Sequence, residues 1–218
     1  MTAMSDDIVQ DIARGRRAPV QGRSQETVQR VRTAASALLA RGVTVEALTT
    51  ASIAGEAGLS IGALYRFFPD KQAIVDAIAL RHMELFQETL GLRMMTAFPA
   101  DPGAFLALVV DEFVAYLDGN PDFRTVAYGA ATGLPGRAVS RPTRDAEATS
   151  GQVAEMVKEF LVEAFDLTPS DDFTLRLRIA TEVGDRLLSF AFDQPDLAAR
   201  AQVLAEAKRL LSGYVFGA

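Results

Sequence analysis

The sequence of 218 residues contains no cysteine and only one histidine. A chain without cysteine has no disulfide framework, no thiolate nucleophile and no thiolate metal ligand. A single histidine leaves few nucleophile–base pairs, and the sequence has neither a P-loop nor a GxGxxG motif after a strand. Acidic sets such as Asp171–Asp172 and Glu182/Asp185 lie on expected helices, where carboxylates usually face solvent. We therefore expect no enzyme, no catalytic residue, no metal site and no cofactor.

Long apolar runs are also missing. No run approaches the length of a membrane span, and the opening MTAMSDDIVQDIARGRR lacks the apolar segment of a signal peptide. Hydrophobic residues make up 49% of the chain and charged residues 23%, which is ordinary for a soluble globular protein. The sequence therefore predicts a cytoplasmic protein that makes no membrane contact.

Acidic residues are few in the front of the chain, whereas they outnumber basic residues in the remainder. Residues 12–71 contain nine Lys/Arg and four Asp/Glu, a net charge of +5, whereas residues 82–218 contain twelve and twenty, a net charge of −8. The overall charge of −6 hides this division. A basic front joined to an acidic remainder predicts an anionic partner for the front only. Chance unevenness in a chain with many charges is the alternative.

The periodicity is helical almost throughout, and no stretch alternates with period two as a strand does. Gly42 and Gly58 are expected helix ends, and Thr49 or Thr50, Ser60 and Asp70 are expected caps. The fold class is therefore all-α. The expected helices span 25–41, 50–57, 61–68, a long helix from Lys71, 105–117, 123–132, 143–165, 171–192 and 197–215.

Two of the short helices, 50–57 and 61–68, are separated by only Gly58, Leu59 and Ser60. A short turn with glycine after the first helix is typical of a helix-turn-helix, whose second helix enters the major groove of DNA. An ordinary tight corner of an all-α domain is the alternative interpretation.

The segment LTTASIAGEAGLSIGALYRFFPDKQAIV (48–75) resembles the DNA-binding core of the TetR family of bacterial transcriptional repressors. The resemblance implies a three-helix DNA-binding domain with a helix-turn-helix at about 48–68, followed by a larger helical ligand-binding and dimerisation domain. On this basis we expect a basic N-terminal arm over 1–23, the DNA-binding domain over 24–80, and an effector-binding and dimerisation domain over 81–218.

Positions that match the family motif have physical reasons to contact double-stranded DNA. Hydroxyls and a lysine can bind phosphates, small residues allow close approach to the groove, and arginine can bind guanine or follow the backbone. The candidate DNA-binding residues are Thr49, Thr50, Ser60, Ile61, Gly62, Ala63, Tyr65, Arg66 and Lys71, with Arg14, Arg16, Arg17 and Arg23 of the arm.

Three positions depart from what many family members show. Ala51 and Ile61 replace residues that are often polar, and Phe67 replaces a frequent histidine. The helix 61–68 therefore offers few polar side chains that could hydrogen-bond to base edges. The sequence leaves core packing and base contact equally open for Ile61. For Tyr65, a half-buried aromatic is the alternative to phosphate contact, and for the arm the alternative is a tail without contact.

The last two expected helices predict a homodimer. Helix 197–215 carries two apolar stripes, of which Leu211 and Val215 belong to one and Leu210 and Tyr214 to the other. Two stripes exceed what one intramolecular core face needs. Helices of about 171–192 and 197–215 from two chains would form a four-helix interface, and its two-fold axis predicts a near-palindromic operator.

The resemblance also implies a small-molecule effector, whose identity the sequence does not reveal. Candidate ligand-binding residues are Phe113, Tyr116, Arg124, Tyr128, Met156, Phe160 and Arg186, although a filled core with polar groups at its edge is equally compatible. His82 is interpreted as a packing residue rather than a sensor. A helical dimeric sensor or protein-interaction module with weakened DNA binding is the alternative function.

Overall fold

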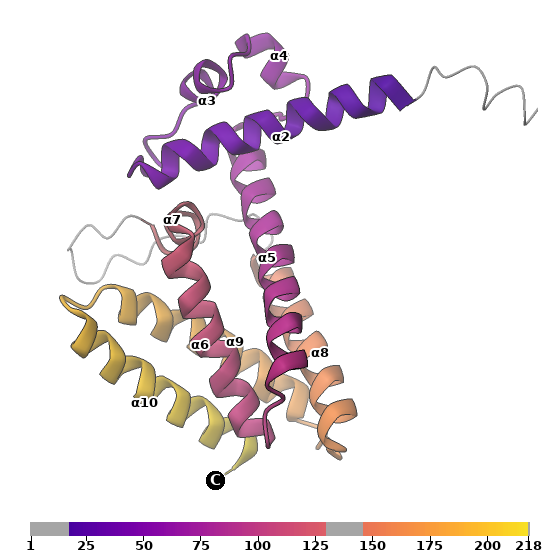
Figure 1. The fold of residues 1–218 in the computed structure, drawn as a ribbon. Coiled ribbons are helices and arrows are strands. Elements are labelled where there is room, and N and C mark those ends of the chain that lie inside the picture. Colours follow the sequence, from indigo (N-terminus) through magenta and orange to yellow (C-terminus); the bar gives the residue numbers. More distant parts are fainter. Residues whose placement is uncertain (1–17, 130–145, 218) are drawn as a thin grey trace, which may run out of the picture.

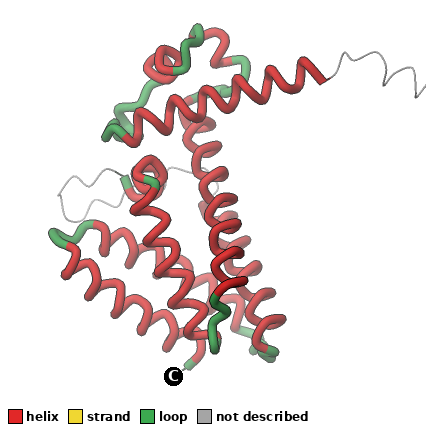
Figure 2. The backbone as a smooth tube through the Cα atoms, viewed as in Figure 1, coloured by secondary structure: helices red, strands yellow, loops and turns green. Residues whose placement is uncertain are grey.

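A computed structural model describes residues 18–129 and 146–217. All regular secondary structure in these two ranges is helical, as the tube in Figure 2 shows. The all-α class is therefore confirmed.

The described N-terminal part, from residue 18 on, contains three helices and the start of a fourth. These are α2 (Ala18–Ala40), α3 (Thr50–Glu56), α4 (Ile61–Tyr65) and α5 (Lys71–Thr96). In Figure 1, α2 crosses one end of α5, and α3 and α4 lie on the side of α2 that faces away from the rest of the molecule. The 26 residues of α5 extend about 39 Å, so this helix connects both ends of the molecule.

The C-terminal part packs around the other end of α5. Its helices are α6 (Pro102–Gly119), α7 (Pro121–Tyr128), α8 (Ala146–Phe165), α9 (Phe173–Phe192) and α10 (Leu197–Phe216). Helix α9 packs between α8 and α10, α10 also contacts α6, and α7 lies against α2. Helix α7 therefore joins the C-terminal part to the first helix of the N-terminal part.

Local side-chain and glycine signals set several helix ends. Thr49, Ser60 and Asp70 each accept a hydrogen bond from the backbone N–H three residues later, which confirms these expected caps. Gly42 and Gly58 have φ of +91° and +63°, left-handed values that end the preceding helices.

Buried side chains form two clusters. The first core cluster joins the N-terminal part to α6 and α7, and its largest fully buried members are Leu39, Leu48, Ile53, Leu64, Ile74, Ile78 and Leu117. The second core cluster lies among α6, α8, α9 and α10 and contains Phe105, Ala154, Leu161, Phe173, Leu177, Ala180, Leu211 and Val215. Because the first cluster includes Phe123 and Val126 of α7, the two parts share a core.

Some boundaries differ from the sequence expectation. Helix α2 begins at Ala18, so residues 18–23, expected in the arm, belong to a helix; Pro19 is tolerated there because the first turn needs no N–H donor. Helix α4 ends at Tyr65, and α7 ends at Tyr128, where Gly129 takes a φ of +78°. The expected division between residues 80 and 81 falls inside α5.

Candidate nucleic-acid interface

The start of α3 is fixed by a reciprocal pair of hydrogen bonds. Thr49 Oγ1 accepts from the Ser52 backbone N–H at 3.0 Å, and Ser52 Oγ accepts from the Thr49 backbone N–H at 3.2 Å. This capping box satisfies backbone donors that the helix itself cannot pair. Both side chains remain exposed, so the cap holds hydroxyl groups at the surface.

A second hydroxyl contact connects α3 to α4. Thr50 Oγ1 and Tyr65 Oη lie 3.1 Å apart, and Tyr65 is 50% exposed. Half exposure fits the half-buried aromatic that the sequence left open, and it leaves the hydroxyl accessible to a partner. The two hydroxyls form one polar spot that bridges the two helices, with hydrogen-bonding capacity suited to a phosphate oxygen.

Helix α4 presents a small, nearly uncharged face. Ser60 Oγ accepts from the Ala63 backbone N–H at 3.2 Å, and Leu64 fixes the opposite face by complete burial. Ile61 is 48% exposed, which removes the core-packing interpretation of this residue. At Gly62 an added Cβ would meet no atom within 4 Å. The front of α4 is therefore open for close approach.

Arg66 is exposed at the C-cap of α4 and has no side-chain partner among the described residues. Its guanidinium therefore needs no bond broken before it meets a partner. A free arginine beside an open helix face suits bidentate contact with guanine.

Lys71 is engaged within the chain. Its Nζ donates to the backbone carbonyls of Val45 and Glu46 at 2.8 Å and 3.1 Å. An ammonium has three donors, so one stays available for a phosphate. Lys71 thus braces the loop before α3 as well as standing at the start of α5.

The sequence did not reveal the contacts that hold the helix-turn-helix against α2. Arg30 Nη2 donates to the Ala57 carbonyl at 2.6 Å, at the turn between α3 and α4. Arg41 forms a 2.8 Å ion pair with Glu56, and its hydrogen bond lowers the pKa of the exposed Glu56 carboxyl. The helical spacing of 25–41 placed these arginines on a polar face, but their partners lie 15 and 27 residues away.

The expected arm contributes little to the described surface. Arg14, Arg16 and Arg17 lie outside the described residues, and Arg23 lies in α2 with its side chain outside the described part. Their contact with DNA stays a prediction.

The described residues expected at a ligand pocket fall into smaller groups rather than into one site. Phe113 and Tyr116 pack against the first core cluster, and Tyr128 joins them there and stacks on Phe192 at 5.7 Å between ring centroids. Phe160 packs in the second cluster, 4.6 Å from Phe105.

Arg124 shares the Phe192 ring with Tyr128, and its guanidinium carbon lies 6.0 Å from the ring centroid. Arg124 lies 3.7 Å from Asp118, and Arg186 is exposed on α9. Met156 is in α8, with its side chain outside the described part. Membership of a filled core, the alternative left open by the sequence, therefore describes Phe113, Tyr116 and Phe160.

His82 has more specific contacts than a packing residue needs. It is 9% exposed, its Nδ1 lies 2.9 Å from Tyr116 Oη, and its Nε2 lies 3.0 Å from Asp122 Oδ2. Burial tends to raise the pKa of the Asp122 carboxyl, but hydrogen bonds from His82 and Ser36 outweigh it and lower that pKa. His82 is therefore the centre of a polar group that joins α5, α6 and α7, and Ser36 of α2 adds to it at Asp122.

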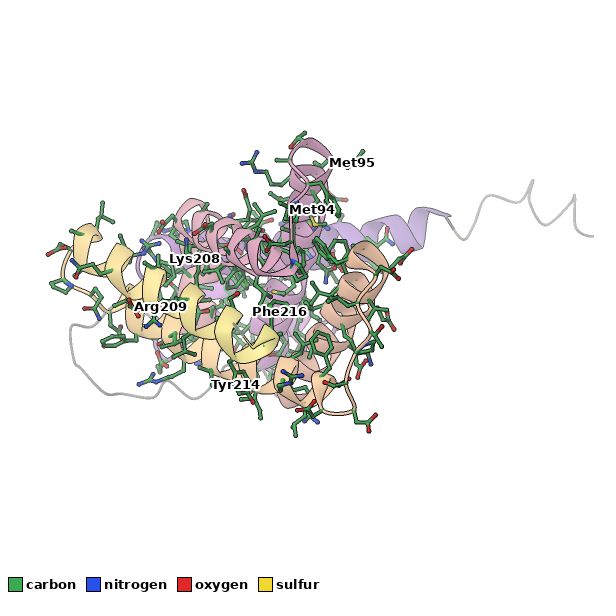
Figure 3. The ribbon with its side chains drawn as sticks, turned by 90° about the horizontal axis from the view of Figure 1, so that it is seen from below. Met94, Met95, Lys208, Arg209, Tyr214 and Phe216 are labelled. Atoms are coloured by element: carbon green, nitrogen blue, oxygen red, sulfur yellow. The ribbon has the colours of Figure 1, made fainter. Side chains whose placement is uncertain are left out.

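A second surface is apolar and lies on α9 and α10. Phe190, Leu210 and Tyr214 are 51%, 49% and 40% exposed, whereas Leu211 and Val215 are buried. The two stripes of α10 thus face different surroundings, and Figure 3 shows Lys208 and Tyr214 pointing to different sides of this helix. An open groove between α9 and α10 is lined by Leu187, Phe190, Gln202, Val203, Glu206, Ala207 and Leu210.

The described ranges contain neither a metal-binding cluster nor a membrane-spanning helix. No group of three or more His, Asp or Glu side chains there could hold a metal ion. None of the helices in the described part combines the length and apolarity that crossing a bilayer requires.

Family models match both parts of the chain. The model for "Bacterial regulatory proteins, tetR family" matches residues 32–78. The model for "Tetracyclin repressor-like, C-terminal domain" matches residues 101–214, which is more than half of the chain.

Solved structures share this architecture, although no curated protein matches. A TetR-family transcriptional regulator from Streptomyces coelicolor is 26% identical, with a TM-score of 0.64 over 87% of this chain and 97% of that chain. A putative tetR family transcription regulator from Shewanella sp. PV-4 is 17% identical, with a TM-score of 0.57 over 86% of this chain and 96% of that chain, and shows likeness in fold alone.

Proposed function

Because this chain belongs to the TetR family of bacterial transcriptional regulators, we propose that it is a ligand-responsive repressor that binds a near-palindromic operator as a homodimer. Membership of this family makes the chain a DNA-binding regulator rather than an enzyme. The operator, the effector and the dimer are the parts that we propose.

The observation that carries the DNA-binding proposal is the exposed front of α4 beside Arg66, which has no side-chain partner among the described residues. Ile61, Gly62 and Ala63 form the surface that approaches base edges, where apolar side chains suit thymine methyl groups. Arg66 supplies the bidentate contact to guanine. The proposed readout is therefore one close apolar fit and one charged contact in each half-site.

Phosphate contacts surround this face in the proposed complex. Thr49, Thr50, Ser60 and Tyr65 offer hydroxyls, and Lys71 offers the donor that its loop contacts leave unused. Arg14, Arg16, Arg17 and Arg23 would add cations along the backbone or in a narrow minor groove. These contacts fix orientation and supply affinity without carrying sequence information.

The proposed dimer uses the exposed apolar surface of α9 and α10. A two-fold axis through this surface would join two copies of the same groove. The two recognition helices would then meet half-sites separated by an integral number of turns, each about 34 Å.

The proposed effector binds between the helices of the C-terminal part. The described side chains of the second core cluster are apolar, which favours a largely apolar molecule. Effector binding would favour a dimer in which the recognition helices are wrongly spaced for the operator. We expect at least one compound in a broad ligand screen to change operator affinity, and less than twofold change throughout would count against effector control.

A dimeric helical sensor or protein-interaction module with weakened DNA binding is a second candidate function. The observation that favours it is the shortage of cations at the recognition face. Arg66 is the single Lys or Arg in residues 59–68, and Lys71 already donates to two carbonyls of the loop before α3.

Selection of binding sites from a random duplex library by the purified protein distinguishes the two functions. A repressor should enrich one near-palindrome. Arg66→Ala should then weaken binding by about 1–3 kcal/mol and relax preference at one position of each half-site. Because Arg66 has no described partner within the chain, this substitution should leave the fold unchanged. Absence of any enriched sequence would favour the second function.

A further inference from the structure

A continuous chain of side-chain hydrogen bonds crosses the junction between the two parts of the molecule. It runs from Asp122 of α7 to His82 of α5 and ends at Tyr116 of α6. Ser36 of α2 extends it, since its hydroxyl is one of the groups that lower the pKa of the Asp122 carboxyl. In the part of the chain whose burial is described, His82 and Thr125 are the buried polar residues. The polar content of this interior is thus concentrated where four helices meet.

All hydrogen bonds in this series of side chains have a defined donor when His82 is neutral. An ionised Asp122 only accepts, so His82 Nε2 must carry the proton that it donates. Nδ1 is then an acceptor and receives the Tyr116 hydroxyl proton. Ser36 donates to the same carboxylate from α2. A single imidazole ring thus fixes α6 and α7 relative to each other, and Asp122 fixes α7 relative to α2.

Aromatic packing leaves this ring little freedom. The imidazole stacks on Phe123 with ring centroids 4.8 Å apart and planes 13° apart, and Tyr116 meets it edge-on at 5.9 Å. Side chains of His82 and Asp122 are 11% and 14% exposed. A carboxylate this well buried is costly unless donors hold it, so displacement of Asp122 from its donors is opposed.

Helix α6 connects this series of hydrogen bonds to the proposed dimer surface. Lys208 of α10 forms a 2.7 Å ion pair with Asp111 of α6, and Arg200 of α10 forms one of 2.7 Å with Asp118 near the end of α6. Tyr116 lies between these two anchors in the sequence of α6. The orientation of α10 in a dimer is therefore linked to Tyr116, and through His82 and Asp122 to α2.

We infer that His82 is a positioning residue that fixes the angle between the DNA-binding helices and the dimerising helices, and so fixes the half-site spacing that the dimer accepts. This inference rests on the proposed function, because spacing has meaning only for a dimer on a two-part operator. Without these hydrogen bonds, α2 would tilt more freely on α7. The recognition helices would then reach half-sites at more than one separation.

The test measures affinity for operators that differ only in their central spacer. The selected operator is compared with versions lengthened or shortened by one base pair, which moves a half-site by about 3.4 Å and rotates it around the duplex. We expect the unaltered protein to lose at least tenfold in affinity on either change. Tyr116→Phe and Ser36→Ala each remove one hydroxyl from an end of the chain, and each should reduce this discrimination to threefold or less.

Thr125→Val is the matched control. It removes a buried hydroxyl of α7 that bonds only to the Pro121 carbonyl within the same helix, at 2.9 Å. This variant should keep the spacing discrimination of the unaltered protein, whatever its stability. Affinity for a single half-site should remain within threefold for all variants. The Ser36→Ala/Tyr116→Phe double variant should discriminate no less than either single variant, because both changes break one chain.

Two results separate failure of this inference from failure of the proposed function. If the unaltered protein selects a spaced palindrome and both end variants discriminate as strongly as it does, the positioning role is wrong and the repressor function stands. Equal loss of discrimination in Thr125→Val would overturn the role as well, because general loosening would then explain the effect. If the unaltered protein selects no operator, both proposals are overturned.

Discussion

At the scale of the residue, hydroxyl groups carry much of the expected contact with DNA. The hydroxyls of Thr50 and Tyr65 lie 3.1 Å apart on the exposed side of α3 and α4. Each orients the other, so a phosphate would meet a prearranged polar spot rather than two mobile side chains. This arrangement offsets the scarcity of cations next to α4.

Tyr65→Phe tests this polar spot. The ring stays in place while the hydroxyl is lost, so we expect operator affinity to fall by about 1 kcal/mol, the usual worth of one hydrogen bond. Sequence preference should not change, because phosphate contacts carry no sequence information. Titration of the variant against the selected operator and against single-base variants measures both quantities. A change in base preference would instead place Tyr65 at a base edge.

Asp122 predicts a pH dependence of stability. Its pKa in the folded protein is lowered, so its stabilising contribution is complete above the unfolded value of about 3.9 and is lost as pH falls through the folded pKa. Asp122→Asn cannot titrate. We expect the variant to be less stable by about 1–3 kcal/mol at pH 7 and the difference to shrink below about pH 4. Urea unfolding from pH 3 to pH 7 measures it, and a gap independent of pH would contradict the assignment.

At the scale of the element, the sequence located the short helices because their ends depend on local chemistry. Thr49, Ser60 and Asp70 cap helices by bonds that reach only three residues along the chain. Glycines at φ of +63° and +91° end the helices before them in the same local way.

Contacts between helices could not be predicted from the sequence in the same way. The Thr50–Tyr65 pair joins residues 15 apart, and Lys71 reaches a carbonyl 26 residues away. Nothing in the spacing of either residue indicates such a partner, because packing of whole helices decides it. The expected pocket residues were divided between two core clusters for the same reason.

Gly62→Ala separates the stability of α4 from its function. An added Cβ meets no atom within 4 Å, and alanine favours a helix over glycine by up to about 1 kcal/mol. We expect unchanged or slightly higher stability, yet at least tenfold weaker operator binding, because the methyl group would stand between the helix and the groove. Thermal unfolding and operator titration measure the two effects.

Gly58→Ala is the companion variant for Gly62→Ala. Its φ of +63° is strained for alanine, which should cost about 1–2 kcal/mol of stability. Undiminished operator affinity in Gly62→Ala would show that α4 does not approach the groove at this residue.

At the scale of the whole molecule, the acidic balance of the chain does not oppose DNA binding. The net charge of −8 belongs to residues 82–218, while residues 12–71 carry +5. In Figure 1, α3 and α4 lie at the end of the molecule away from α8, α9 and α10. Exposed charges beyond about 10 Å are largely screened at ordinary salt, so the acidic helices repel DNA only weakly at the recognition face.

The dimer proposal predicts that a surface charge on α10 abolishes assembly. Leu210 is 49% exposed, so Leu210→Glu should change the stability of one chain little while it removes the dimer and weakens operator binding at least 100-fold. Sedimentation gives the mass in solution. Leu80→Glu is the matched control, since Leu80 is 63% exposed on α5 and should leave the dimer intact. A dimeric Leu210→Glu variant would place the interface elsewhere.

The salt dependence of operator binding tests the central claim most directly, namely that this acidic chain binds DNA through its basic N-terminal part. A dimer that makes about 6–10 phosphate contacts should lose about 10³–10⁵ in affinity between 50 and 200 mM salt, with the selected operator preferred over a scrambled duplex at each concentration. A loss of less than tenfold, or equal affinity for the scrambled duplex, would contradict sequence-specific binding by this surface.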